Sequence, residues 1–252
     1  MKYINKKLNI EKVTVNNIAR KYGTPTYCYS YTKLRENILR FKKSFKSISP
    51  LICFAIKSNT NVSLIREIKK FGLGADVVSM GELMTAIKAG ISPKKIVFSG
   101  VGKTSQEINY AIDKKILLIN AESKSEIHEI DRLARLKKKK VQIGIRLNPN
   151  TDAKTLRQIS TGKKGNKFGV NNKTFLELVK YCLESKNIDL KCLSVHIGSQ
   201  ILDHKPFEKM LKVVDKILSK INHEFEFIDL GGGMGISYNN ENKKLNYKKY
   251  NF

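Results

Sequence analysis

LICFAIKSN, residues Leu51–Asn59, joins a short apolar run directly to a lysine. An apolar run of this length is typical of a strand that is buried on both faces, as in a parallel sheet. Lys57 then lies at the carboxyl end of the strand, where α/β folds build their sites. From this stretch alone, Lys57 is either a surface residue at a strand terminus or a desolvated amine kept for chemistry.

The same unit of apolar strand, turn and amphipathic helix repeats along the chain. The pattern predicts seven strands, at residues 51–56, 75–78, 96–98, 116–119, 141–147, 192–197 and 225–230. Three of the turns end in an S/T-x-x-E capping box, at Ser79/Glu82, Thr104/Glu107 and Ser123/Glu126. Successive βα units require parallel strands and right-handed crossovers. The fold class is therefore α/β, either an open doubly wound sheet or an eight-stranded barrel.

The first fifty residues precede this repeat. They predict a helix at 13–22, a short strand at Thr26–Ser30 and a helix at 31–48. We therefore divide the chain into a lead-in, residues 1–50, and a β/α domain, residues 51–252. The tail 239–252 is polar and lysine-rich, and it offers no apolar run for an eighth strand, although a barrel has to close.

Composition limits the class of protein. The 252 residues are 41% hydrophobic, and no apolar run approaches the ~20 residues that a membrane span needs. The amino-terminal MKYINKKLNI lacks the apolar core of a signal peptide, so we expect a cytoplasmic protein that does not bind membranes. Four cysteines without C-x-x-C spacing argue against a zinc site and a disulfide framework, and no metal site is predicted.

The charge is strongly basic, with 48 Lys and Arg against 22 Asp and Glu, a net +26. Such a balance indicates either a nucleic-acid partner or a lysine-rich composition spread over solvated helices. Trp is absent, and no aromatic residues interleave with the basic ones as in a base-stacking surface. We expect no specific nucleic-acid site, although polyanions should bind at low salt.

Four groups of residues that could carry chemistry lie at the carboxyl ends of predicted strands. They are Lys57, Asp76, His196 in VHIGSQ, and the glycines of DLGGGMG at 229–235. Successive free N–H groups of such a glycine-rich turn form a concave site that suits phosphate. A phosphate site, an imidazole that can lie against a ring and a lysine that can form an imine together suggest pyridoxal phosphate.

Several segments, in this order, resemble diaminopimelate decarboxylase from about Thr24 to Tyr238. They are FAIKSN, GADVVSMGEL, IVFSGVGK, RLNPNTDAKT, ISTG, KFGV, SVHIGSQ and DLGGGMGISY. ISTG and KFGV favour this family over the related ornithine and arginine decarboxylases. The resemblance implies a pyridoxal-phosphate enzyme with a TIM-type (β/α)8 barrel of the alanine racemase kind, a β-rich second domain and a homodimer.

The resemblance also implies roles for single residues. Lys57 would hold the cofactor through a Schiff base, and His196 would stack on the pyridine ring. Asp76 and Arg146 would orient the lysine and the ring. The phosphate would be bound by Ser199, Gly231, Gly232, Gly233 and Gly235. The implied reaction is the loss of CO₂ from the D-configured centre of meso-diaminopimelate, which gives L-lysine.

Two departures from the family pattern stand out. Leu156-Arg157-Gln158 occupy the place of the usual His-Pro-Tyr, in a loop of the family's active site. After Gly235 there is neither the E-P-G-R segment of the eighth strand nor the C-E-S-x-D segment of the second domain. We therefore expect a barrel of seven strands whose first and last strands have unpaired edges, with little or no activity on its own. The alternative is a non-catalytic single-barrel carrier of pyridoxal phosphate, although that class lacks the D-L-G-G-G motif.

Overall fold

The computed structural model describes residues 1–153, 161–162, 167–236 and 238. The chain divides into two compact units, one covering Met1–Pro50 and the other beginning at Leu51. The substituted loop at 156–158 and the tail at 239–252 lie outside the described residues.

The first unit contains a small antiparallel sheet and two helices. Its elements are β1 (Lys2–Ile4), β2 (Lys7–Ile10), β3 (Val13–Thr14), α1 (Val15–Tyr22) and α2 (Tyr31–Ser44). The three strands were not predicted, because they are only two to four residues long, too short to give a clear pattern.

The strand predicted at Thr26–Ser30 is wrong: the segment belongs to neither sheet. An extended segment becomes a strand only when a neighbouring strand satisfies its backbone groups. Ser30 instead starts α2, where its Oγ accepts a hydrogen bond from Lys33 N at 3.1 Å and donates to Glu11 Oε1 at 2.7 Å.

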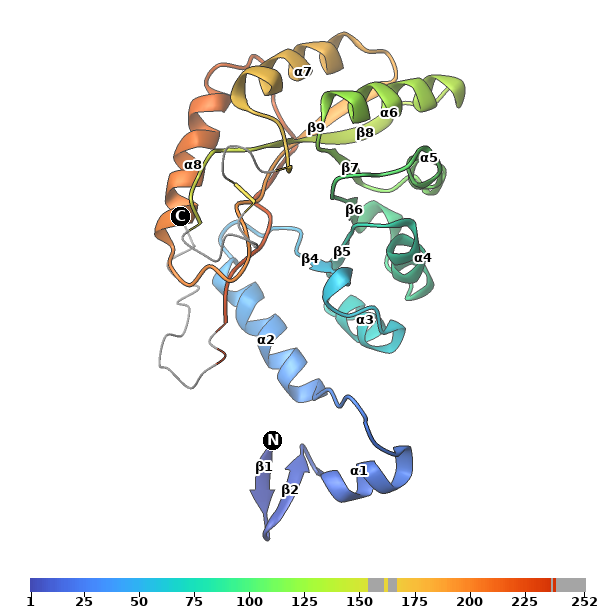
Figure 1. Ribbon diagram of the computed structural model, residues 1–252, viewed down its shortest axis with the longest axis vertical. Coiled ribbons are helices and arrows are strands. Elements are labelled where there is room, and N and C mark those ends of the chain that lie inside the picture. The colour runs from blue at the N-terminus through green and yellow to red at the C-terminus, as the bar shows by residue number, and fades with distance from the viewer. Residues whose placement is uncertain (154–160, 163–166, 237, 239–252) are drawn as a thin grey trace. The chain divides into compact units, whose positions relative to one another are not determined.

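The second unit contains seven parallel strands, which confirms the predicted number and direction. They are β4 (Cys53–Ala55), β5 (Gly74–Val77), β6 (Ile96–Phe98), β7 (Leu118–Ala121), β8 (Val141–Leu147), β9 (Ile188–Val195) and β10 (Phe227–Asp229). Their spatial order follows the sequence, so that within the described sheet β4 and β10 form the two edges. The sheet curls into a partial barrel, with the helices along its outer side (Figure 1). The barrel class, and not the open doubly wound sheet, is therefore correct.

Helices connect consecutive strands. They are α3 (Val62–Lys69), α4 (Met80–Lys88), α5 (Ser105–Lys114), α6 (Lys124–Leu136), α7 (Asn172–Glu184) and α8 (Lys205–Leu218), with 3-10 turns η1 (Ile56–Ser58) and η2 (Pro93–Lys95). Each places an apolar stripe on the outer face of the sheet, as with Leu83 and Ala86 of α4. Ile and Leu side chains that are fully buried between the sheet and the helices form most of the core.

The three predicted capping boxes differ in detail. Thr104 and Glu107 form a complete box, in which each side chain accepts from the other's backbone N–H. At Ser79 and Ser123 the hydroxyl accepts as predicted, but the glutamate side chain bonds the residue before the cap, Val78 or Glu122. Both serines have φ near −155° against −77° at Thr104, and this turns their own N–H away.

The inside of the curve has an apolar floor. Val97, Leu118 and Cys192 are buried together there, and the half-buried Cys53 and Phe227 pack against them. Because side chains of a strand alternate between its faces, the next inward positions toward the carboxyl ends carry the polar residues of the site.

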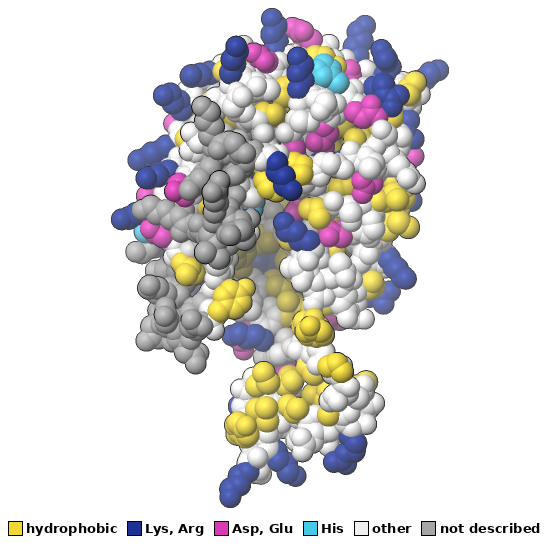
Figure 2. All heavy atoms as spheres, in the orientation of Figure 1, with side chains coloured by type: hydrophobic (Ala, Val, Ile, Leu, Met, Phe, Trp, Pro, Cys, Tyr) yellow, Lys and Arg dark blue, Asp and Glu magenta, His cyan; other side chains and the backbone are white. Residues whose placement is uncertain are grey.

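Lysine and arginine side chains are dispersed over the face shown in Figure 2, with acidic side chains among them. Over the described part of the chain, no helix has the length and apolar character needed to span a membrane.

Candidate functional site

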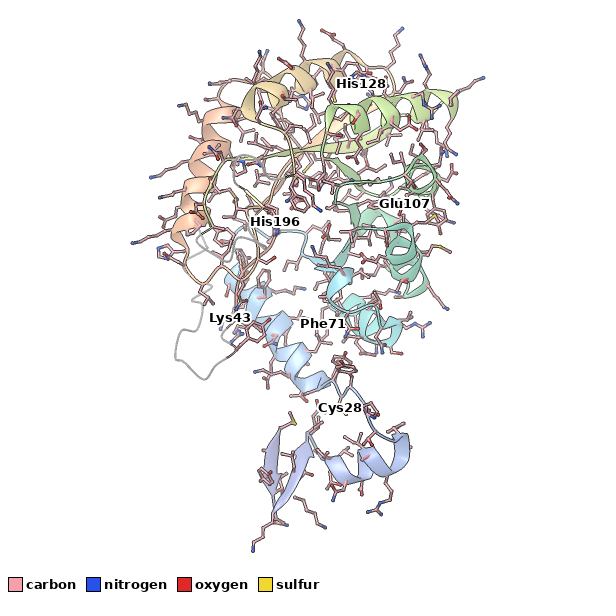
Figure 3. The ribbon with its side chains drawn as sticks, in the orientation of Figure 1. Cys28, Lys43, Phe71, Glu107, His128 and His196 are labelled. Carbon is pink, nitrogen blue, oxygen red and sulfur yellow. The ribbon has the colours of Figure 1, made fainter. Side chains whose placement is uncertain are left out.

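Lys57 lies in η1, directly after β4. The preceding Ile56 is completely buried, whereas Lys57 itself is exposed at the carboxyl end of the sheet. Its positive charge lowers the pKa of both Asp76 and His196. These two residues come from β5 and from the end of β9, so Lys57 is within electrostatic reach of groups that are far apart in sequence. His196 lies inside the curve, on the side away from the surrounding helices (Figure 3).

Asp76 sits next to β4, since Ala55 is its partner in the register of β4 and β5. Burial is the main reason why the pKa of Asp76 rises from 3.8 to about 6. The hydrogen bond from Ser99 Oγ to Oδ1, at 2.6 Å, opposes this rise, and the negative charge of Asp229 adds to it. Asp76 therefore changes charge near neutral pH, beside Lys57.

Asp76 is one end of a hydrogen-bonded set inside the curve, which we call the polar layer: Asp76, Ser99, Asn120, Ser194 and Asp229. Asn120 Nδ2 donates to Asp229 Oδ2 at 2.8 Å, and it lies 3.4 Å from the hydroxyl oxygens of both Ser99 and Ser194. Ser194 Oγ also donates to Asp229 Oδ2, at 3.0 Å. The layer thus connects two carboxyl groups through three neutral side chains.

His196 is held as a neutral ring. Burial first, and then the positive charges of Arg146 and Lys57, lower its pKa from 6.5 to about 3. Gly232 N–H donates to His196 Nδ1 at 3.2 Å, which places the ring proton on Nε2. A neutral imidazole of fixed orientation can lie against an aromatic ligand without adding charge to it.

The glycine-rich turn after β10 packs backbone to backbone against the segment after β9. A Cβ atom on Gly231 would lie 2.6 Å from Val195 O and 2.7 Å from His196 Nδ1, and one on Gly233 would collide with Gly198 O. Gly231 and Gly233 also have positive φ, of 67° and 89°, which glycine adopts without strain. At Gly232 a Cβ would meet nothing within 4 Å, so this residue faces open space.

Most of the amides in this turn already have acceptors. Gly231 N donates to Asp229 Oδ1 at 2.8 Å, Gly232 N to His196 Nδ1, and Gly235 N to Ile201 O at 2.9 Å. Of the four glycine amides in this turn, only Gly233 N finds no acceptor in the described part of the chain. A phosphate at this turn would therefore meet one unused glycine N–H, and Gly231 or Gly232 would have to exchange its acceptor. Ser199, the residue after Gly198, is exposed.

Arg146, on β8, is buried and paired. Its Nη1 lies 2.7 Å from Glu122 Oε1, and its Nη2 donates to His196 O at 3.4 Å. Its guanidinium also lies over the ring of Phe168, 4.9 Å from the ring centre. Arg146 therefore supports the backbone of His196.

Glu122, which follows β7, contacts three other segments of the chain. Besides Arg146, it accepts from Gly100 N at 2.9 Å and from Gly169 N at 3.0 Å. Next to it, the buried Lys103 donates to Glu126 Oε1 at 2.7 Å and to Gly100 O and Asn120 O. This network holds Gly100, after β6, and Gly169, before α7, at the end of β7.

The structure brings the predicted residues to one end of the sheet. Lys57, Asp76, Arg146, His196 and the glycine turn all belong to the carboxyl ends of their strands or follow them. The sequence did not single out Ser99, Asn120, Glu122, Ser194 or Asp229 as site residues. A polar residue inside an otherwise apolar strand, as in LLINA and CLSVHI, was the signal that could have found Asn120 and Ser194.

Comparisons with known proteins identify the family and the fold. The family model described as the pyridoxal binding domain of pyridoxal-dependent decarboxylases matches residues 31–252. The chain is similar to the diaminopimelate decarboxylase of Helicobacter pylori strain J99, with 44% identity over 223 residues, 87% of this chain and 55% of the relative. It is 38% identical to that of Aquifex aeolicus over 248 residues, 97% of this chain and 58% of the relative.

The fold is also similar to a solved structure, diaminopimelate decarboxylase from Helicobacter pylori complexed with L-lysine. The TM-score is 0.90 at 40% identity, with 94% of this chain and 60% of that chain covered. The chain thus spans little more than half the length of the relatives that it matches.

Proposed function

Because the chain belongs to the family of pyridoxal-dependent decarboxylases, we propose that it binds pyridoxal phosphate and serves the removal of CO₂ from meso-diaminopimelate, which gives L-lysine. The observation that carries the proposal is the convergence of Lys57, Asp76 and His196 at one end of a barrel whose sequence is 38–44% identical to diaminopimelate decarboxylases. The ornithine and arginine enzymes, and a non-catalytic carrier, are the alternatives.

The residues fit the chemical parts of this cofactor. Lys57 is an exposed amine that can bond an aldehyde, and the neutral His196 can lie against a pyridine ring. Gly233 N–H and the open space at Gly232 leave room for an anionic group, with Ser199 as a further donor. When bound, pyridoxal phosphate supplies an electron sink for the electron pair that CO₂ leaves behind.

The protein's part in the reaction is binding, orientation and control of charge. Lys57 would hold the cofactor covalently, and His196, fixed by Gly232 and supported by Arg146, would set the plane in which the cofactor lies. Asp76 would carry or release a proton beside the Lys57 amine. Arg146 contributes a buried positive charge, which is balanced by Glu122.

Labelling tests the cofactor site. The protein is incubated with pyridoxal phosphate, reduced with borohydride and digested, and the labelled peptide is identified by mass spectrometry. We expect the label on Lys57. Lys57→Arg keeps the positive charge but cannot form the imine, so its label should disappear. A main label on any other lysine contradicts the proposed site.

Ligand preference tests the reaction class. The cofactor-loaded protein is titrated calorimetrically with meso-diaminopimelate, L-lysine, L-ornithine and L-arginine. We expect diaminopimelate and L-lysine to bind more tightly than the other two. Preference for ornithine or arginine would assign the chain to the other decarboxylases, and binding of none of the four by the loaded protein would favour the carrier.

A further inference from the structure

The two carboxyl groups of the polar layer receive different numbers of hydrogen bonds. Within the described residues, Asp229 accepts three, from Asn120 Nδ2, Ser194 Oγ and Gly231 N, at distances of 2.8 to 3.0 Å. Asp76 accepts one from the same part of the chain, from Ser99 Oγ at 2.6 Å. Because each donor stabilises the charged form of a carboxyl group, Asp229 is the better place for a negative charge.

Asn120 is locked in the orientation that produces this difference. Its Nδ2 faces Asp229, while its Oδ1 is buried and finds no hydrogen-bond partner within the described residues. That oxygen points at Gly144, where a Cβ atom would strike it. Turning the amide over would place Oδ1 against the Asp229 carboxylate, so that two acceptors would face each other.

The negative charges around Asp76 favour its protonated form, as does the difference in hydrogen bonds. Asp229 raises the pKa of Asp76, as does Glu82 from α4, whereas Lys57 lowers it. Two thiols also face the layer. Burial first, and then Asp229 and Asp76, raise the pKa of Cys53 on β4 to about 12, and burial and Asp229 raise the pKa of Cys192 on β9, so both stay protonated. Asp76 and Asp229 lie above the same apolar floor, where two negative charges repel each other strongly. The pair therefore favours a state in which one of the two carboxyl groups is protonated.

We propose that Asn120 and Ser194 are positioning residues that keep Asp229 charged, so that the one proton retained by the two carboxyl groups lies on Asp76, beside Lys57. The charged Asp229 then holds Gly231 N–H and with it the start of the glycine turn. A protonated Asp76 places no negative charge near the Lys57 amine. Only the use of that amine to hold a cofactor rests on the proposed function.

The location of the proton is measurable without cofactor. The protein is labelled with ¹³C at the aspartate carboxyl carbons and titrated by NMR from pH 4.5 to 8. Asp76→Asn and Asp229→Asn each remove one signal and so assign the two carboxyl groups. We expect the Asp76 signal to titrate near pH 6, while the Asp229 signal keeps the chemical shift of a carboxylate down to pH 5.

Two variants distinguish a positioning role of Asn120 from a general loss of stability. Asn120→Ala removes a donor from Asp229, so the proton should become shared: the Asp229 signal should begin to titrate in this range and the midpoint of Asp76 should fall. Ser99→Ala removes the donor of Asp76 itself and should raise that midpoint. Each move is expected to be of about one unit, a tenfold change in the dissociation constant, as for the loss of one hydrogen bond to a charged group.

Opposite shifts of the Asp76 midpoint in Asn120→Ala and Ser99→Ala support the proposal, and shifts in the same direction overturn it. A wild-type titration in which Asp229 takes up the proton and Asp76 remains charged at pH 5 overturns it even if neither variant folds. Failure of Lys57 labelling would count against the proposed function alone, because the NMR signals do not depend on the cofactor.

Discussion

Arg146 Nη1 and Glu122 Oε1 form an ion pair of 2.7 Å, with 9% and 1% of the two side chains exposed. The pair links β8 to the residue that follows β7, and Glu122 also holds Gly100 and Gly169. Removing one partner of such a pair leaves a buried charge without compensation, which usually costs more than the pair itself contributes.

We expect Glu122→Gln to lower the free energy of unfolding by about 3 to 5 kcal/mol, as measured by urea denaturation. Glu129→Gln is the matched control, because Glu129 pairs with Arg132 at 2.8 Å on the surface of α6, where Arg132 is 48% exposed. A surface pair of this kind contributes at most about 1 kcal/mol. Equal losses of unfolding free energy in the two variants would show that the buried pair of Glu122 contributes no more to stability than a surface pair.

Asp76 should make the fold less stable as the pH rises. Its pKa is 3.8 in the unfolded reference and about 6 in the folded chain, mainly because of burial, so between these values the folded state binds more protons. Its contribution is therefore fully present below pH 4 and is lost as the pH passes 6, by roughly 3 kcal/mol at most. Asp76→Asn should remove this loss, which urea denaturation at pH 4.5 and 7.5 would detect.

His196 should make the fold more stable as the pH rises, the opposite of the effect of Asp76. Its pKa falls from 6.5 to about 3 on folding, chiefly through burial, so the folded state binds fewer protons than the unfolded state between these values. Its contribution is present above pH 6.5 and is lost as the pH falls toward 3. In His196→Gln the stability should therefore decrease from pH 4.5 to 7.5, whereas in Asp76→Asn it should increase. A flat profile in both variants would contradict both assignments.

The glycine turn offers a pair of matched substitutions. Gly233→Ala forces a Cβ atom against Gly198 O at a φ of 89°, and we expect a loss of more than about 2 kcal/mol in unfolding free energy. Gly232→Ala meets open space and should cost less than about 1 kcal/mol. Comparable losses would mean that the turn can move away from the segment after β9.

The sequence was sufficient for the number, order and direction of the strands in the second unit and for the end of the sheet that carries the site. Strands 96–98 and 141–147 have the predicted bounds, because apolar runs between turn signals are buried on both faces. The small sheet β1–β3 could not be predicted, since strands of two to four residues are too short to give a clear pattern. The polar layer was missed for a different reason: which polar residues of separate strands meet depends on the register and the curl of the sheet.

The same alternation has a consequence for folding. Asp76, Asn120, Ser194 and Asp229 occupy the inward positions of four strands whose outward neighbours are mostly apolar, Ala75, Ile119 and Val195 among them. A shift of one residue in any of these strands would turn its polar side chain toward the helices and an apolar one toward the carboxyl groups. A shifted register is therefore destabilised on both faces of the sheet. The residues that form the site thus also help to select the correct strand pairing when the barrel folds.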